Sequence, residues 1–325
     1  MTAQAIARSI SRTVADLLNA GQFEARVLAI FKRVCDLITH DGEVVAVVLP
    51  QIGDGPLNIV VNEATDLFAG IGPGAKVTLD GDQLQIGGLR VELGEATVWE
   101  PRPEWDRLRA RRAMIAPCVP LLRAICVRHA PAGSLLSLLS DRLPDDKLAG
   151  PVLSAARKAT GILWDGWKGH PDKLKAGAMG LAGLGGGLTP AGDDFLTGAM
   201  LGAWLTHPTP HALCRALVEV AVPRTTMLSA SFLQAAARGE CSAPWHSLLA
   251  AMDDGPNSAV EARITAAVQK IMSHGATSGA DSLVGFLLSF DALEEGAAAG
   301  RPRPSAVGTV RSRRRRGRAS LILEG

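Results

Sequence analysis

The stretch VVAVVL (44–49) begins a run of short β-type segments that decides the fold. Turn sequences rich in glycine, proline and aspartate separate each segment from the next. The six segments lie at 44–49, 58–61, 76–79, 83–86, 89–93 and 96–99. Because this spacing leaves no room for crossover helices, we expect an antiparallel sheet that curls into a small barrel.

Toward the N-terminus, the apolar pattern changes. Ile6, Ile10, Val14 and Leu17 recur at helical spacing, and a second apolar series runs over 23–37. We therefore expect N-terminal helices over residues 1–40, followed by a β-rich domain over 41–103.

Toward the C-terminus, Pro101-Arg102-Pro103 ends the β-type pattern, and residues 104–299 show none of it. This region reads as about eight helices broken at Pro117, Pro131, Pro144, 169–171, 208–210 and 255–256. Residues 300–325 contain RSRRRRGR without apolar periodicity, which is typical of a disordered basic tail. The expected fold class is α+β: a small barrel-like N-terminal part, then a larger all-α domain.

Composition narrows the function classes. Of the 325 residues, 47% are hydrophobic and 20% charged, which excludes a disordered protein. The formal charge of +2 hides an asymmetry, because residues 301–325 hold eight arginines and one acid, so the rest of the chain carries −5. With no tyrosine and only 13 other aromatics, a stacking platform for nucleic acid is not expected. The tail alone would give salt-sensitive, non-specific binding.

The cysteines and the N-terminus indicate a compartment. Five cysteines are odd in number and never form a CxxC pair, which favours reduced thiols. The N-terminal residues lack the apolar core of a secretory signal, and no run of 18 apolar residues occurs. We expect a cytoplasmic protein with no membrane segment.

The motif GLGGGLTPAGDDFLTG (183–198) is the most unusual stretch. Its glycines lead into Thr189-Pro190, which predicts a helix N-cap and first helical residue, with Asp193 and Asp194 soon after. Free amides at a helix N-terminus attract anions, whereas the aspartates suit a cation, a substrate NH2 group or a base. The alternative is purely structural: Thr189 caps the helix, the two aspartates interact favourably with its dipole, and the glycines form a tight connection. Gly198 and Gly202 indicate close helix packing instead.

A second stretch, HGATSGADSLVG (274–285), repeats this chemistry. Gly187, Thr189 and Asp193 have the same spacing as Gly275, Thr277 and Asp281. Two helix N-termini of this kind would converge on one site, unless the similarity is chance. His274 is a catalytic candidate because it directly precedes the repeat, although it also suits a helix C-terminus.

A third stretch, RTTMLSAS (224–231), lies between the other two. Arg224 beside hydroxyl groups suits bidentate capture of a carboxylate or phosphate, and we expect it to open a helix. A solvated arginine beside a threonine cap is the alternative. The candidate catalytic residues are Asp193, Asp194, His274 and Asp281. The candidate substrate-binding residues are Gly185, Gly186, Gly187, Thr189, Gly192, Arg224, Thr225, Thr226, Ser229, Thr277, Ser278 and Gly279.

These three motifs together resemble the AllH subunit family of bacterial oxamate carbamoyltransferase, over roughly residues 20–297. The resemblance implies a heteromeric enzyme of allantoin and purine-nitrogen breakdown, with partner subunits. Its reaction would convert oxalurate and phosphate to oxamate and carbamoyl phosphate, or the reverse. It names no certain cofactor.

Two other functions stay open. The chain could be a non-catalytic assembly or regulatory subunit, whose helix junction serves packing. It could also be a phosphate-handling kinase or ligase, in which the aspartates hold Mg²⁺. The absence of an evident Ser/His/Asp or Cys/His set favours catalysis by positioning and electrostatic stabilisation over a covalent enzyme intermediate.

Overall fold

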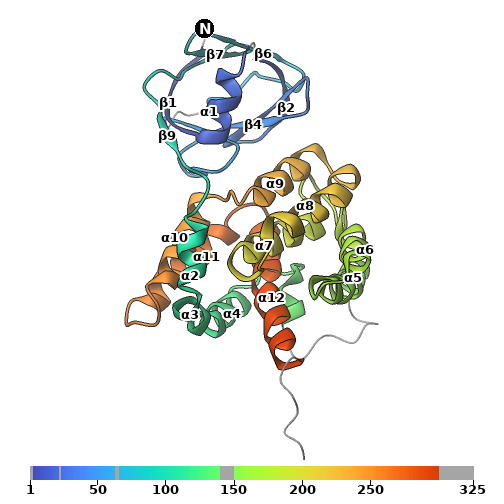
Figure 1. Ribbon diagram of the computed structural model, residues 1–325. Coiled ribbons are helices and arrows are strands. Elements are labelled where there is room, and N and C mark those ends of the chain that lie inside the picture. Colours follow the sequence, from blue (N-terminus) through green and yellow to red (C-terminus); the bar gives the residue numbers. More distant parts are fainter. Residues whose placement is uncertain (1–2, 22, 63–65, 140–149, 300–325) are drawn as a thin grey trace, which may run out of the picture.

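The computed structural model describes residues 3–21, 23–62, 66–139 and 150–299. It confirms the α+β class: a β-barrel over residues 3–99 precedes a helical region. Figure 1 shows the barrel at one end of the helical region, with one helix, α9, close to it. The expected basic tail (300–325) and the helix break at Pro144 lie outside the described residues.

Nine strands form the barrel sheet. They are β1 (Ala3–Ser11), β2 (Glu24–Ile30), β3 (Val34–Thr39), β4 (Val44–Val48), β5 (Asn58–Val61), β6 (Lys76–Asp80), β7 (Gln83–Ile86), β8 (Leu89–Glu92) and β9 (Thr97–Trp99). The order is β5-β4-β3-β2-β6-β7-β8-β1-β9, and pairing of β1 with β5 closes an eight-stranded barrel. All six strands expected between residues 44 and 99 are present.

Strand directions are mixed in this barrel. Most neighbours run antiparallel, as expected, but β1 runs parallel to β8 and β9, and β4 runs parallel to β5. The loop 49–57 returns the chain to the end of the barrel where β4 began, so β5 can lie beside β4 in the same direction. A long loop replaces the helix that usually makes such a crossover.

The expectation of N-terminal helices over 1–40 is wrong, and so is a β-domain that starts at residue 41. Residues 3–39 supply β1, β2 and β3, and only α1 (Arg12–Asn19) is helical. In β1, Ala5 and Ala7 are buried while Ile6 is exposed, which is strand alternation. Pairing with strands far along the chain overrides the local helical spacing.

The helical region follows the predicted breaks. Its helices are α2 (Trp105–Ala110), α3 (Arg112–Ile115), α4 (Val119–Arg128), α5 (Pro151–Trp167), α6 (Pro171–Leu181), α7 (Ala191–Thr206), α8 (Pro210–Ala221), α9 (Met227–Ala237), α10 (Ala243–Asp253), α11 (Val260–Met272) and α12 (Ser278–Ala299). Short 3-10 turns, η1 (Ala116–Cys118), η2 (Leu135–Leu139) and η3 (Val222–Arg224), join some of them. None of the helices in the described ranges is long and apolar enough to cross a membrane.

The helix pair α7 and α12 forms the centre of the helical core. α7 is buried on nearly all sides, and its contact with α12 is the most extensive of the described helix pairs. A Cβ on Gly198 would lie 1.7 Å from the Ser282 carbonyl oxygen, and one on Gly285 would lie 1.9 Å from the Phe195 carbonyl oxygen. The two backbones therefore touch, which matches the expected packing role of Gly198.

The barrel and the helical region meet through a small apolar cluster and several hydrogen bonds. Leu228 and Phe232 of α9 pack on barrel residues that include Ile38, Val44 and Leu57. The amide of Ala243 donates to the Asp54 carbonyl oxygen over 2.9 Å. The junction places α9 between the barrel and the candidate site.

Candidate functional site

The two glycine-led motifs meet at the start of α7 and α12. The hydroxyl oxygens of Thr189 and Ser278 lie 2.7 Å apart, so the segments preceding the two helices are in direct contact. Gly187 has a φ of +90° and Gly275 a φ of +64°, a left-handed conformation that favours glycine. The structure therefore brings together the two motifs that the repeat pairs in sequence.

Thr189 does not cap α7, contrary to expectation. The helix begins at Ala191 with Pro190 in the N-cap position, and it has no side-chain cap hydrogen bond. The Thr189 hydroxyl is engaged with Ser278 instead. A contact between two helices has taken the place of the local cap.

Asp193 holds the glycine loop in place. Its side chain is 1% exposed, accepts a hydrogen bond from the Gly183 amide over 3.0 Å, and accepts another from the Thr225 hydroxyl. Burial raises the pKa of Asp193, although hydrogen bonds from Thr225, Gly183 and Ser229 oppose the shift. Since both carboxyl oxygens have partners, Asp193 connects the loop to the segment before α9.

Asp194 lies where the two motifs meet. Its Oδ2 atom is buried and has no hydrogen-bond partner among the described residues. Burial, followed by the nearby charges of Asp281 and Asp193, raises the pKa of Asp194 well above its usual range, against hydrogen bonds from Ser278 and Thr189. A carboxyl group held toward its neutral form, with an open oxygen, is suited to proton transfer or to binding a polar ligand group.

Asp281 is the buried counterpart on α12. Its side chain is 0% exposed, and Oδ1 accepts a hydrogen bond from the Leu135 amide over 2.6 Å. Burial raises its pKa to about 6, while the Leu135 and Thr277 hydrogen bonds oppose the shift. Its Oδ2 atom is buried without a hydrogen-bond partner in the described chain. Asp281 therefore anchors η2 to the first turns of α12.

The start of α9 forms the third side of the site. Thr226 is the N-cap of α9, because its hydroxyl accepts from the Ser229 amide over 3.1 Å. The same hydroxyl donates to the Leu188 carbonyl oxygen over 2.6 Å, and the Ser229 hydroxyl lies 3.4 Å from that oxygen. The hydroxyl-rich segment thus binds the glycine loop through its backbone.

The sequence predicts that Arg224 opens a helix, and this prediction is wrong. In the structure Arg224 is the last residue of η3. Its side chain is exposed, and Nη1 donates to the Val220 carbonyl oxygen over 2.8 Å. The extended backbone of Thr225 and the N-cap residue Thr226 separate it from α9. The structure leaves this guanidinium at the surface beside the site.

His274 contacts the barrel rather than the aspartates. Its Nδ1 lies 2.9 Å from the Lys270 carbonyl oxygen, and its Nε2 lies 3.4 Å from the Ile52 carbonyl oxygen. Lys270 also reaches this barrel loop, with Nζ donating to the Gln51 carbonyl oxygen over 2.6 Å. These contacts connect the end of α11 to the loop 49–57.

The candidate glycines divide into two groups. Gly185, Gly186 and Gly187 are exposed, and their amides donate no hydrogen bond within the described structure. A Cβ on Gly192 would lie 2.0 Å from the Leu181 carbonyl oxygen, and one on Gly279 the same distance from that of Ile271. The first group is available to a ligand, whereas Gly192 and Gly279 permit close packing. Thr277, partly buried, precedes α12 beside Ser278.

Sequence reasoning missed the partners that contribute backbone atoms. The Leu135 amide, the Leu188 carbonyl and the Ile52 carbonyl each bind a candidate residue. No signal in the sequence marks them, since every such residue has these atoms. Within the described ranges, no group of three or more His, Cys, Asp or Glu side chains is arranged to hold a metal ion.

The fold and site together define a class: a two-part protein in which a closed barrel precedes a helical region with an acidic site at paired helix N-termini. Residues 5–98 match the AllH family N-terminal domain, and residues 181–290 match oxamate carbamoyltransferase subunit AllH. Because these matches cover most of the chain, the protein belongs to the AllH family. No solved structure matches it.

Proposed function

We propose that this chain contributes part of the active site to a heteromeric carbamoyltransferase that acts on oxamate or oxalurate and on carbamoyl phosphate. The family name supports a role as a subunit of such an enzyme. The observation that carries the proposal is the Asp194 carboxyl group, whose buried Oδ2 has no hydrogen-bond partner within the described ranges and lies at the junction of two helix N-termini.

The chemistry of carbamoyl transfer matches this arrangement. A carbamoyl group carries an NH2 donor, which the open oxygen of Asp194 can accept, and a carbonyl oxygen that becomes negative as the carbon is attacked. The unpaired amides of Gly185, Gly186 and Gly187 suit a phosphate or that developing oxyanion. In the phosphate-consuming direction, a phosphate oxygen bonds to the carbamoyl carbon of oxalurate. The bond to the oxamate nitrogen then breaks, and this nitrogen gains a proton.

Three carboxyl groups beside an anionic substrate would ordinarily repel it. Burial is the largest cause that raises the pKa of Asp193, Asp194 and Asp281, so each is shifted toward its neutral form. Burial therefore acts most strongly against negative charge at Asp194, whose pKa is raised well above its usual range. The backbone of Arg224 lies beside the Gly183 segment, since a Cβ on Gly183 would lie 2.5 Å from the Arg224 carbonyl oxygen, while its guanidinium donates to the Val220 carbonyl oxygen.

Transfer without a covalent enzyme intermediate is part of the proposal. All five cysteines are free and buried, and burial raises the pKa of each thiol, which opposes formation of a thiolate nucleophile. A carbamoyl-enzyme adduct detected by mass spectrometry would contradict this mechanism. The free thiols also support a reducing compartment, the cytoplasm. A role in allantoin breakdown is what the resemblance to the AllH family implies.

The test is Asp194→Asn in the complex reconstituted with its partner subunits. We expect turnover of carbamoyl phosphate and oxamate to fall about 100-fold or more. The Asn amide cannot transfer a proton, and its NH2 group cannot accept a hydrogen bond as the carboxyl oxygen does. The matched control is Asp172→Asn, an exposed acid in the first turn of α6, which should retain full turnover. Full activity of Asp194→Asn with an intact fold would instead favour an assembly or regulatory role.

A further inference from the structure

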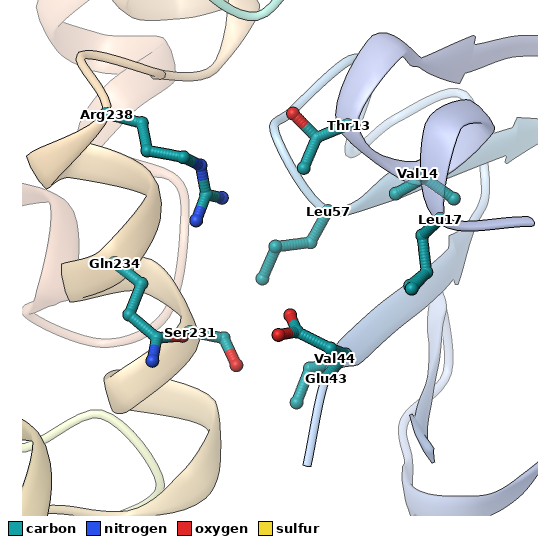
Figure 2. A pocket seen from close by; sticks show the side chains of 9 residues that line it. All are labelled: Thr13, Val14, Leu17, Glu43, Val44, Leu57, Ser231, Gln234 and Arg238. Atoms are coloured by element: carbon teal, nitrogen blue, oxygen red, sulfur yellow. The ribbon is translucent and has the colours of Figure 1, made fainter. Parts of the chain in front are cut away.

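A cavity lies between the barrel and α9. Its volume is about 280 Å³, and Figure 2 shows side chains from α1, the start of β4 and α9 facing one another across it. This volume lies just below the range of about 300 to 1,000 Å³ that is common for small-molecule sites. None of the candidate residues of the aspartate site lines it. The space fits a molecule of amino-acid size.

The barrel side of this cavity includes an apolar wall. Val14 and Leu17 of α1 line it together with Val44 and Leu57. Val14, Val44 and Leu57 are at most 5% exposed, so they form a fixed wall. Such a wall would bury a branched aliphatic group and exclude water from it.

The α9 side is polar. The Gln234 amide has no hydrogen-bond partner among the described residues, and its side chain extends from α9 toward the cavity. Arg238 pairs with Glu240 through Nε at 2.8 Å and Nη2 at 2.9 Å, which leaves Nη1 without a bond in the described chain. These two side chains supply N–H donors of the kind that a carboxylate accepts.

Glu43 supplies the opposite charge. Its carboxylate lines the cavity from the turn before β4 and makes no ion pair or hydrogen bond within the described ranges. Glu240 cannot take its role, because Glu240 is 8% exposed and already accepts from Arg238 and from Thr13. The cavity therefore has donors for an anion, one open carboxylate for a cation, and an apolar wall.

We propose that this cavity binds a small aliphatic α-amino acid. Its carboxylate is bound by Arg238 and Gln234, its ammonium group by Glu43, and its side chain by the apolar wall of Val14, Leu17, Val44 and Leu57. This site is separate from the proposed carbamoyl site, although α9 contributes to both through Gln234 and Thr226.

The test is isothermal titration calorimetry of the full chain with L-leucine and with 4-methylpentanoic acid, which lacks the ammonium group. We expect saturable L-leucine binding that Glu43→Gln weakens about tenfold or more, because a charge-assisted hydrogen bond is lost. The same substitution should leave 4-methylpentanoic acid unaffected. Gln234→Leu should weaken both ligands.

Two controls keep the result specific. Asp41→Asn changes an exposed acid two residues from Glu43 that does not line the cavity, and it should not change L-leucine affinity. Asp194→Asn should also leave it unchanged, which separates this site from the carbamoyl site. No saturable heat with L-leucine, or binding insensitive to both Glu43→Gln and Gln234→Leu, would overturn the proposal.

Discussion

The starts of α7 and α12 carry the same residues at the same spacing, yet they use their aspartates differently. Asp193 of α7 has partners for both carboxyl oxygens, the Gly183 amide and the Thr225 hydroxyl. Asp281 of α12 bonds the Leu135 amide through one oxygen and has no hydrogen-bond partner for the other among the described residues. In the α7 copy, both carboxyl oxygens bind neighbouring segments. In the α12 copy, one oxygen binds η2 and the other has no hydrogen-bond partner among the described residues.

The adjacent residues extend this contrast. Position 194 on α7 is a second aspartate, while the residue after Asp281 is Ser282, whose hydroxyl bonds within its own helix to the Gly279 carbonyl oxygen. The repeated motif therefore builds the scaffold of both helix starts, and the one residue without a counterpart carries the proposed chemistry. The repetition marks the proposed site, and the departure from it marks the residue to which we assign the chemistry.

The largest effect should come from separating the two helices. Gly198→Ala places a Cβ against the Ser282 carbonyl oxygen, and we expect it to destabilise the protein by about 3 kcal/mol or more. Chemical denaturation measures this change. Gly161→Ala, at an exposed position of α5 with open space around it, is the matched control and should be neutral or stabilising by up to about 1 kcal/mol. Equal effects at both positions would contradict the backbone contact.

The next test concerns the open oxygen of Asp281. Its folded pKa of about 6 lies above the ordinary aspartate value of 3.8, so the folded state holds the proton more tightly. Stability from this group is present below the unfolded pKa and is lost as pH rises toward 6. The Asp281→Asn variant lacks this pH-dependent loss of stability. Relative to the wild type, its free energy of unfolding should therefore rise by up to about 3 kcal/mol between pH 3.5 and pH 7. Urea denaturation at several pH values measures it; a pH-independent difference would refute the assignment.

The smallest effect should follow from removing the contact between the motifs. Thr189→Val deletes the hydroxyl that lies 2.7 Å from Ser278, at a cost of about 1 kcal/mol. Thr197→Val is the control, because that hydroxyl bonds only the Asp193 carbonyl oxygen one turn back in α7. A double-mutant cycle with Ser278→Ala should give a coupling energy for Thr189 and none for Thr197.

The sequence allowed good prediction where the signal was local. The strands between 44 and 99 alternate with clear turns, and all were predicted correctly. The segment 3–11 was misread because Ile6 and Ile10 stand four residues apart, a helical spacing, whereas in the strand Ile6 is exposed and Ile10 is buried on either side of a register shift between Ala7 and Ser9. Its pairing with β5, β8 and β9 decided the outcome, and those partners lie more than 45 residues away.

For the site, the convergence of the two motifs was predictable from their shared chemistry. The different states of Asp193 and Asp194 were not, because they depend on the Gly183 amide and the Thr225 hydroxyl arriving from other elements. The exposed, surface-facing Arg224 likewise depends on η3, which local residue preferences did not indicate.

The backbone contact between α7 and α12 has a consequence for which substitutions the core can accept without moving the site. Where side chains set the distance between helices, each core substitution shifts that distance slightly. Here main-chain atoms at Gly198 and Gly285 set it. The surrounding apolar residues can therefore drift while the separation of Asp194 and Asp281 stays constant, so long as these glycines are retained.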